Sequence, residues 1–269
     1  MKRALGDATA QLTAISDTPR LDAELLLAHA LGAERGTMLL DPDRFALPST
    51  YAALVARRMA YEPVAYILGT RDFWTISLSV GPGVLIPRAD SETLIEAALA
   101  HFGEAGPATT LDLGTGPGTL LLAALDQWPK AHGVGVDRSE TALGYAQRNA
   151  TALGLGARAT FVEGGWDDGG SADLILCNPP YVETSAPLDR QVADYEPHEA
   201  LFAGRDGLDD YRAILPTLAR RIHPGGIAIL EIGASQERAV TALASAAGLA
   251  VRSRKDLSGH VRALLCVSE

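Results

Sequence analysis

Residues 111–118, Leu-Asp-Leu-Gly-Thr-Gly-Pro-Gly, are the stretch on which the predicted fold depends. A short apolar run ends at Leu113, three glycines follow at alternate positions, and a helical pattern begins near Thr119. Glycines let a backbone approach a ligand closely, and a helix start offers free N–H groups. A tight turn in any αβ domain is the competing interpretation of this stretch taken alone. The stretch therefore predicts a strand, a loop and a helix, with a candidate ligand site at the loop.

A carboxylate, Asp137, ends the next apolar run, residues 134–136. In nucleoside-binding αβ folds, a carboxylate at this strand end accepts both ribose hydroxyls. Unlike a Walker phosphate loop, the loop has no Lys after Gly118, and Thr119 stands where the dinucleotide pattern has its third glycine. Asp112, beside the loop, repels phosphate but suits an ammonium or a sulfonium. The loop therefore favours a cationic nucleoside, S-adenosylmethionine, over a dinucleotide.

A second candidate site is the segment Asn178, Pro179, Pro180 and Tyr181, which follows the apolar run 174–177. Asn178 Oδ1 and the Pro179 carbonyl are two acceptors for one NH2 group, Pro180 stiffens the loop, and Tyr181 offers a ring for stacking. Two directed acceptors free the lone pair of a planar nitrogen for in-line attack on a sulfonium methyl group, without a strong base. A rigid turn with a capping Asn is the competing interpretation. We therefore expect methyl transfer to an amide or amine nitrogen, with Asn178, Pro179 and Tyr181 as catalytic residues.

Apolar runs alternate with helical patterns over the rest of this region, as a parallel sheet with helices on both faces requires. The final two runs have only a loop between them, which indicates an antiparallel pair. The expected fold class is therefore α/β, with a Rossmann-like sheet that has an antiparallel last strand. The expected strands are 111–113, 134–136, 160–162, 174–176, 227–230, 250–252 and 261–267.

The region before this sheet has a helical pattern followed by an alternating one. Thr18 and Pro19 predict a helix start, Gly32 predicts its end, and a second helical run covers residues 51–60. From Trp74 the period changes to two, which predicts a hairpin.

The hairpin is expected to have its turn at residues 81–83 and its second strand at 84–86, before a helix capped by Asp90 or Ser91. The expected domains are thus a helical domain (1–73), a linking hairpin (74–88) and a methyltransferase domain (89–269).

The composition indicates which partners and which cellular location to expect for this protein. The net charge of -10, from 23 basic and 33 acidic residues, disfavours direct nucleic-acid binding. No apolar run is long enough to span a membrane, and the first residues lack the apolar core of a signal peptide, so we expect a cytoplasmic protein without a membrane partner. Cys177, Cys266 and the six scattered histidines have no metal-ligand spacing, so no metal site is expected.

With these motifs in order along nearly the whole chain, the sequence resembles the release factor glutamine methyltransferases. That family methylates the side-chain amide (N5) of the Gly-Gly-Gln glutamine in bacterial peptide chain release factors. Several matching stretches lie outside the generic methyltransferase core. The stretches that carry the resemblance are 20–27 (RLDAELLL), 62–69 (EPVAYILG), 73–74 (FW), 85–92 (LIPRADSE), 178–181 (NPPY), 195–197 (YEP), 200–201 (AL), 206–208 (DGL), 230–233 (LEIG) and 256–259 (DLSG).

The resemblance implies S-adenosylmethionine as cofactor, with S-adenosylhomocysteine as product, and a release factor as protein substrate. It implies substrate contacts by Asn178, Pro179, Pro180 and Tyr181. The cofactor contacts that it implies are Gly114, Thr115, Gly116, Pro117, Gly118, Asp137, Trp166 and Asn178.

The sequence departs from the family pattern at three positions: Gly165 stands where Asp is usual, Tyr61 where Gly is common, and His260 where Arg is usual. The first departure removes a polar contact near the adenine unless Asp167 or Asp168 supplies it.

Two alternative enzymes are a ribosomal-protein glutamine methyltransferase and a nucleic-acid adenine or guanine amino methyltransferase. A nucleoside-binding module without transfer is the non-enzymatic alternative.

Overall fold

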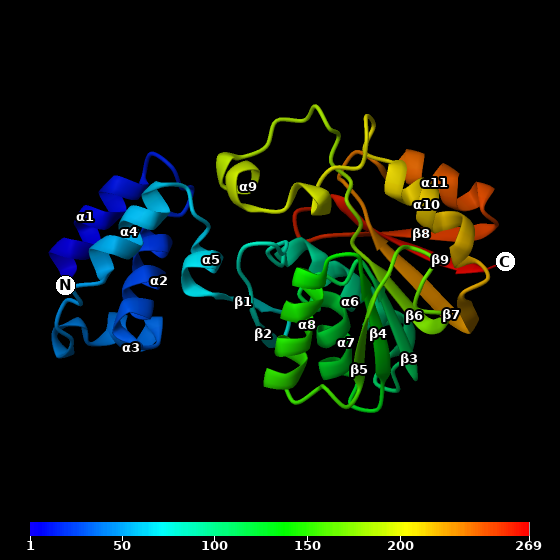
Figure 1. Cartoon of the computed structure of the whole chain (residues 1–269), viewed down its shortest axis with the longest axis horizontal. Helices are drawn as coiled ribbons and strands as arrows, with labels where there is room; N and C mark the ends of the chain where they lie inside the picture. The colour runs from blue at the N-terminus through cyan, green and yellow to red at the C-terminus, as the bar shows by residue number, and fades with distance from the viewer. Residues whose placement is uncertain (269) are drawn as a thin grey trace. The chain divides into compact units, whose positions relative to one another are not determined.

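The strands from Thr109 onward form a seven-stranded sheet in the order β5-β4-β3-β6-β7-β9-β8 (Figure 1). Strands β3 to β7 are parallel, and β9 runs antiparallel to both of its neighbours, β7 and β8. The predicted α/β class with an antiparallel last strand is therefore confirmed. The strands are β3 (Thr109–Leu113), β4 (His132–Asp137), β5 (Ala159–Glu163), β6 (Ala172–Cys177), β7 (Ile222–Glu231), β8 (Leu249–Lys255) and β9 (Val261–Ser268).

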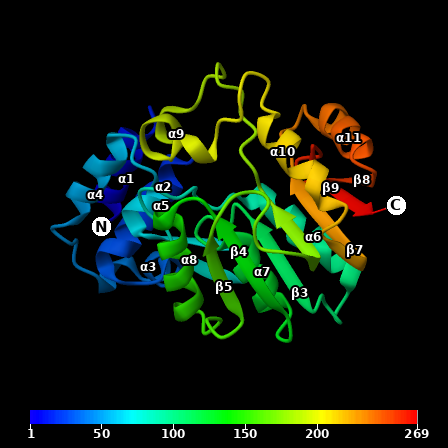
Figure 2. The same ribbon diagram turned by 45° about the vertical axis from the view of Figure 1, so that its right-hand side comes forward.

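The two faces of the sheet are covered by different helices, as Figures 1 and 2 show. Alternate residues of one strand point to opposite faces. Leu174 and Leu176 of β6 pack with helices α6 and α7, whereas Ile175 and Cys177 pack with α10 and α11. Burial on both faces explains why the central strands are continuous apolar runs in the sequence. The helices are α6 (Glu92–Phe102), α7 (Thr119–Gln127), α8 (Glu140–Ala152), α10 (Asp209–Leu218) and α11 (Glu237–Ala246).

The strand order reverses between β3 and β6, since β4 and β5 continue on one side of β3 and β7 lies on the other side of β6. Ligands bind at such a switch point, beyond the carboxyl ends of the strands. Cys177 of β6 pairs in register with Leu113 of β3 and Leu230 of β7. Asn178, the next residue, therefore lies at the switch point, level with Glu231 at the end of β7.

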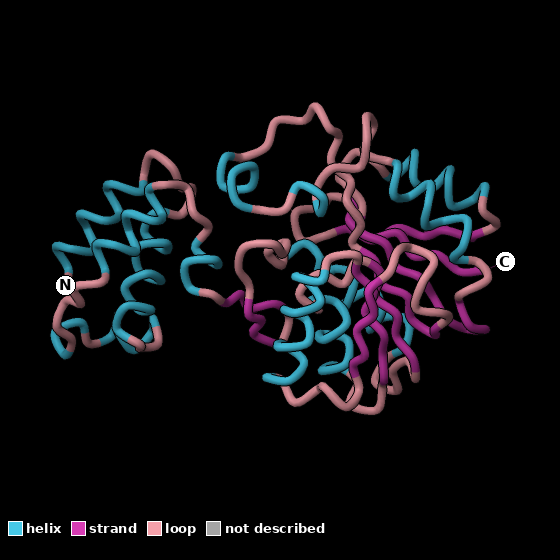
Figure 3. The backbone as a smooth tube through the Cα atoms, viewed as in Figure 1, coloured by secondary structure: helices cyan, strands magenta, loops and turns pink. Residues whose placement is uncertain are grey.

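The computed structural model describes residues 1–268, and Figure 3 shows their helices, strands and loops. The described residues form two compact units. One unit comprises Met1–Thr70 together with Leu188–Glu196, and the other comprises the remaining described residues. The first unit is helical around a buried core that includes Leu12, Leu26 and Leu27. Its helices are α1 (Lys2–Leu12), α2 (Pro19–Leu31), α3 (Arg35–Leu40), α4 (Tyr51–Met59), α5 (Val64–Leu68) and α9 (Arg190–Tyr195), with a 3-10 turn η1 at Pro42–Arg44.

Helix α2 begins and ends where the sequence predicts. Pro19 is its first residue, and Gly32 ends it in the left-handed conformation, with φ of 59°. Thr18 differs from the expectation, because its hydroxyl donates to Asp22 Oδ1 at 3.2 Å instead of capping the helix.

Helix α9 was missed in the sequence, and it belongs to the helical unit although it lies far along the chain. The Tyr195 hydroxyl donates to the Ala60 carbonyl at 2.8 Å, and the Arg190 guanidinium lies 4.4 Å from the centre of the Tyr61 ring. The chain therefore leaves the αβ unit at Pro187 and returns to it at Pro197.

The structure corrects the predicted hairpin. Its strands are β1 (Thr70–Phe73) and β2 (Ile76–Ser79), with the turn at Trp74, and residues 84–86 form no strand. Trp74 adopts a positive φ of 53°, and its backbone N–H donates to Glu92 while its indole N–H donates to Gln127. The apolar run at residues 84–86 that predicted a second strand instead reflects the burial of Val84 and Ile86. The compact units divide at Thr70 and Arg71, so most of this hairpin belongs to the αβ unit.

Within residues 1–268, no helix combines the length and the apolar character needed to cross a bilayer.

An ion pair is buried in the helical unit, where Arg58 Nε lies 2.8 Å from Asp22 Oδ2. The two side chains are 4% and 9% exposed, so neither charge is well solvated. Removing one partner of such a pair leaves an uncompensated charge at low dielectric.

We expect Arg58→Ala to lower the free energy of unfolding by about 3 kcal/mol or more. Arg57→Ala is the matched control, because it removes an exposed pair with Glu62 and should cost less than about 1 kcal/mol. Urea unfolding of both variants, followed by circular dichroism, measures the difference. Equal losses in the two variants would show that burial of the Arg58 pair is unimportant.

Candidate active site

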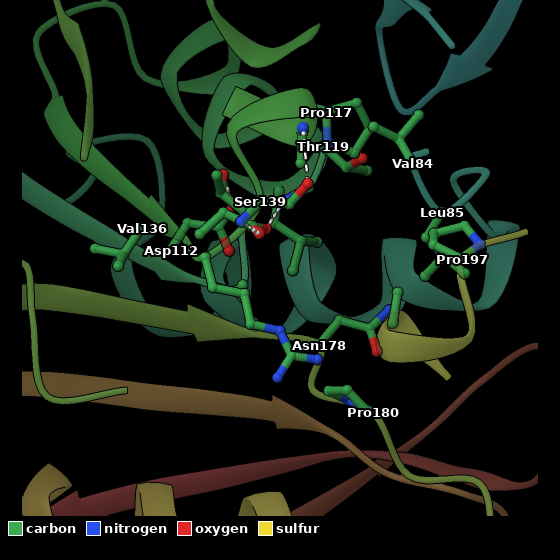
Figure 4. A pocket seen from close by; sticks show the side chains of 18 of the residues that line it. Val84, Leu85, Asp112, Pro117, Thr119, Val136, Ser139, Asn178, Pro180 and Pro197 are labelled. Carbon is green, nitrogen blue, oxygen red and sulfur yellow. Dashed lines mark hydrogen bonds between the residues drawn. The ribbon is translucent and has the colours of Figure 1, made fainter. Parts of the chain in front are cut away.

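A cavity of about 300 Å³ lies at the carboxyl ends of β3, β4 and β6, at the switch point of the sheet (Figure 4). Figure 4 shows Asn178 and Pro180 across the cavity from Pro117 and Thr119. The structure thus brings most of the predicted site residues to one cavity, whereas Gly118, Pro179 and Tyr181 are not among the residues that line it. The predicted residues that line it are Gly114, Thr115, Gly116, Pro117, Asp137, Trp166, Asn178 and Pro180.

The glycine loop is fixed to the neighbouring strand β4. The backbone N–H groups of Gly114 and Thr115 both donate to the Val136 carbonyl at 2.9 Å. Gly114 has φ of 69°, and a Cβ atom placed on it would lie 3.2 Å from the Trp166 ring. Glycine is therefore required at 114 both for the backbone conformation and for the close approach of the indole.

Asp137 ends β4 with both carboxylate oxygens partly used. Its Oδ2 accepts from the Gly116 N–H at 2.8 Å, and its Oδ1 accepts from the Ser139 N–H at 2.9 Å. An ionised carboxylate has about four acceptor positions, so about two stay open for a ligand. The side chain is half-buried and lines the cavity. This arrangement suits a ligand with two adjacent hydroxyl donors.

Asp112 is the deepest charged group of the cavity wall. Its Oδ2 accepts from the Thr115 hydroxyl at 2.6 Å and from the Leu121 N–H at 3.1 Å. Its Oδ1 is fully buried and has no hydrogen-bond partner within residues 1–268. Burial raises the pKa of Asp112 to about 7, against the lowering effect of these two hydrogen bonds. A buried carboxylate with an unpartnered oxygen is a site that a cationic ligand group would stabilise.

Trp166 forms another part of the wall. Its indole Nε1 donates to Asp210 Oδ1 at 3.0 Å, and its backbone carbonyl accepts from Arg221. The side chain is therefore held by contacts of its own, and its ring faces the glycine loop.

The departure at Gly165 leaves this part of the wall without a carboxylate from that position. Asp168 does not supply one to the cavity, because its carboxylate accepts from the Gly165 N–H at 2.8 Å. Gly164 and Gly165 line the cavity, whereas Asp167 and Asp168 are not among the lining residues.

Asn178 is held by a side chain that the sequence suggested only as a helix cap. Its Nδ2 donates to the Ser91 hydroxyl at 3.2 Å, and Ser91 in turn donates to Glu231 Oε2 at 2.5 Å. Ser91 makes no side-chain cap for α6. From the sequence, Glu231 was included only in a stretch that resembles the family, and no role in the site was predicted for it. Glu231 is nevertheless the last residue of a buried strand at the ligand-binding edge, as Asp137 is.

Tyr181 holds the other end of the same loop. Its hydroxyl donates to Glu231 Oε1 at 3.3 Å, and its carbonyl accepts from Gln236 Nε2 at 3.0 Å. Burial raises the pKa of this hydroxyl, which therefore stays protonated near neutral pH. Pro179 is buried between these two anchored residues. The loop is thus rigid through side-chain hydrogen bonds as well as through its prolines.

A segment that follows α9 also lines the cavity, although no role in the site was predicted for it from the sequence. It contributes Pro197, Glu199 and Ala200. Arg138, the residue after Asp137, fixes it by donating to the Glu199 carbonyl at 2.7 Å. No local pattern in the sequence connects these two positions.

The cavity wall lacks the features of a metal centre. Among the described residues, no three His, Cys, Asp or Glu side chains form a group that would hold a metal ion.

Comparison with solved structures defines the class of the αβ unit. A 16S rRNA methyltransferase from T. thermophilus in complex with AdoMet and guanosine is 20% identical with a TM-score of 0.53, over 74% of this chain and 50% of that chain. A methyltransferase from Pyrococcus furiosus is 19% identical with a TM-score of 0.53, over 81% of this chain and 97% of that chain. Residues 106–247 also match a family described as a methyltransferase domain. The fold is therefore that of the class I methyltransferases.

Matches that cover most of the chain identify the family. Residues 3–69 match the family described as the PrmC N-terminal domain. A release factor glutamine methyltransferase of Rhodospirillum rubrum is 44% identical over 93% of this chain and 79% of that protein. The release factor glutamine methyltransferase of Caulobacter vibrioides is 42% identical over 93% of this chain and 90% of that protein. The chain belongs to the release factor glutamine methyltransferase family, which confirms the resemblance seen in the sequence.

The pKa values of Asp112 and Glu231 are both raised to about 7, so the free energy of unfolding of the ligand-free protein depends on pH. Because both values lie above those of the unfolded chain, the folded state binds more protons between about pH 4 and pH 7. This contribution to stability is present at low pH and is lost as pH rises through about 7.

We expect Asp112→Asn to flatten the fall in the free energy of unfolding between pH 4 and pH 7, because the amide does not ionise. Glu231 should retain its share of the slope. Urea unfolding of both proteins at several pH values, without ligand, measures this. An unchanged slope in the variant would contradict the burial argument.

Proposed function

We propose that this protein transfers a methyl group from S-adenosylmethionine to the side-chain amide N5 of the glutamine in the Gly-Gly-Gln motif of peptide chain release factors. The observation that carries the proposal is the position of Asn178. Its Nδ2 is occupied by Ser91, and within residues 1–268 no group donates to its Oδ1. Asn178 lines the same cavity as Asp112 and Asp137.

The residues of the cavity fit the proposed cofactor at three points. The open acceptor positions of Asp137 match the two ribose hydroxyls, and the unpartnered Asp112 Oδ1 matches the positive charge of the methionine part. The Trp166 ring offers an apolar surface for the adenine. When bound, S-adenosylmethionine supplies an electrophilic methyl group on a sulfonium centre.

The chain itself orients the nucleophile. Asn178 Oδ1 and the Pro179 carbonyl accept the two hydrogens of the substrate NH2 group, and the Tyr181 ring stacks on its amide plane. These contacts would draw the nitrogen out of conjugation with its carbonyl and hold its lone pair ready for attack on a methyl group. Asn178, Pro179 and Tyr181 are the proposed catalytic residues, and Pro180 keeps their spacing.

A release factor is the substrate that the family membership favours. The relatives that match over most of this chain are named release factor glutamine methyltransferases. The net charge of -10 also favours a protein over a nucleic acid as the partner. The helical domain, proposed at residues 1–73, would recognise the release factor, since it lies outside the methyltransferase-domain match.

Cofactor binding is tested separately from transfer. We expect Asp137→Ala to weaken the binding of S-adenosylhomocysteine by at least about tenfold, because hydrogen bonds to a charged acceptor are lost. Glu163→Ala is the matched control: Glu163 pairs with Asp137 in register at the end of β5 but is not among the residues that line the cavity. Calorimetric titration of both variants gives the dissociation constants. Equal weakening in both would contradict the assignment of Asp137.

Transfer is tested with a full-length release factor and labelled cofactor, followed by mass mapping of the methylated residue. We expect one methyl group on the Gly-Gly-Gln glutamine and about a 100-fold lower rate in Asn178→Ala, because one directed acceptor is lost. Cofactor affinity and unfolding midpoint, measured in parallel, control for misfolding.

A wild-type protein that binds cofactor but does not methylate an accessible Gly-Gly-Gln glutamine would exclude this substrate. Label in a ribosomal protein or on a nucleobase amine would then point to one of the alternatives. Undiminished turnover in Asn178→Ala would exclude the proposed mechanism.

A further inference from the structure

Three side chains from distant parts of the chain form a line of hydrogen bonds that ends at the cavity. Glu231 Oε2 accepts from the Ser91 hydroxyl at 2.5 Å, and the Ser91 oxygen accepts from Asn178 Nδ2 at 3.2 Å. Glu231 is 1% exposed and Ser91 is 3% exposed, so water does not compete for either contact. We call Glu231, Ser91 and Asn178 the relay.

The direction of the relay follows from the number of hydrogens. An ionised carboxylate only accepts, so the single hydroxyl hydrogen of Ser91 points to Glu231. The Ser91 oxygen is then left as an acceptor, and only the NH2 end of the Asn178 amide satisfies it. Asn178 Oδ1 consequently faces the cavity.

A protonated Glu231 would remove this direction. The acid hydrogen would point to the Ser91 oxygen, and the hydroxyl hydrogen of Ser91 would be free to point to Asn178. The Asn178 amide would then be equally stable in the reversed orientation, with its NH2 group toward the cavity. Two NH2 groups facing each other repel, so a reversed Asn178 cannot hold a substrate amide.

Resting on the proposed function, we propose that Glu231 and Ser91 are positioning residues, which hold the Asn178 amide so that its oxygen faces the substrate nitrogen. Neither residue needs to touch the reacting atoms. The same carboxylate also accepts from Tyr181 at 3.3 Å, so it orients both ends of the substrate-binding loop.

The charged and titratable surroundings of Glu231 come from several elements. Burial raises its pKa to about 7, whereas the Ser91 hydrogen bond and the positive charge of Arg262 lower it. The deprotonated fraction therefore rises through the neutral range. The other groups that face it are Asp90, Tyr181, Tyr211 and Cys177, with Arg88 close to Tyr181.

The experiment compares kcat for methyl transfer to a release factor, at saturating cofactor, from pH 6 to pH 9. We expect Ser91→Ala and Glu231→Gln to lose about 10- to 100-fold in kcat, with KM for the release factor changed less than about threefold. Ser91→Thr should keep kcat within about twofold, because it keeps the hydroxyl. In the wild type kcat should rise as pH passes about 7, and this rise should be absent in Glu231→Gln.

Tyr211→Phe is the matched control for loss of a buried hydrogen bond. Tyr211 is fully buried, and its hydroxyl donates to the backbone carbonyl of Glu231 at 2.8 Å, outside the relay. We expect this variant to lose stability but to keep kcat and its pH profile.

Wild-type kcat in Ser91→Ala would overturn the proposal, as would a Tyr211→Phe loss equal to that of Glu231→Gln. If Glu231→Gln does not fold, the kcat values of Ser91→Ala and Ser91→Thr alone decide whether the Ser91 hydroxyl positions Asn178.

A second readout does not depend on the substrate. The side-chain ¹⁵N resonance of Asn178, assigned with Asn178→Ala, should shift with pH near 7 in the wild type and not in Ser91→Ala or Glu231→Gln. If the wild type does not methylate a release factor, the proposed function fails, and this titration still decides whether the relay exists. A resonance with the same pH dependence in all three proteins would overturn the relay.

Discussion

Two buried carboxylates, Asp112 and Glu231, are the constraint on which the active-site edge of this protein depends. Each is 1% exposed, and burial raises the pKa of each to about 7. Burying an ionised carboxylate costs several kcal/mol unless hydrogen bonds or an opposite charge compensate. The hydrogen bonds from Thr115, Leu121, Ser91 and Tyr181 are therefore required by the fold as well as by the site. The other oxygen of Asp112 has no hydrogen-bond partner within residues 1–268.

The order of the strands explains why these two groups act on one cavity. Strand β6 lies between β3 and β7, so Asn178 lies between the strand that carries Asp112 and the strand that carries Glu231. The sheet is apolar on both faces, with helices packed on each. The buried carboxylates Asp112 and Glu231 lie toward the carboxyl ends of their strands, the edge at which ligands bind in such sheets. Asp112 faces the proposed cofactor, and Glu231 acts on the loop that is proposed to hold the substrate.

Much of this arrangement was predictable from local sequence patterns. The apolar runs that end at Leu113, Cys177 and Leu230 predicted strands, because buried parallel strands need continuous apolar residues. Asp137 was predictable at the cavity because it directly follows such a run. The glycine loop was predictable because its spacing is local.

The rest depends on contacts that no local pattern encodes. Ser91 and Glu231 are 140 residues apart, so only the folded sheet brings them together. The second strand of the hairpin was wrong because the apolar run at residues 84–86 reflects burial rather than strand pairing. Helix α9 was missed because its packing depends on residues near Ala60, far earlier in the chain.

The central claim is that Asn178 Oδ1 faces the nitrogen that is methylated. A crystal structure of this protein with S-adenosylhomocysteine and a release factor domain containing the Gly-Gly-Gln motif tests this claim directly. The account predicts the glutamine side-chain nitrogen within about 3 Å of both Asn178 Oδ1 and the Pro179 carbonyl, with Ser91 still bonded to Glu231. A glutamine amide bound elsewhere, or held by its oxygen at Asn178, would contradict it.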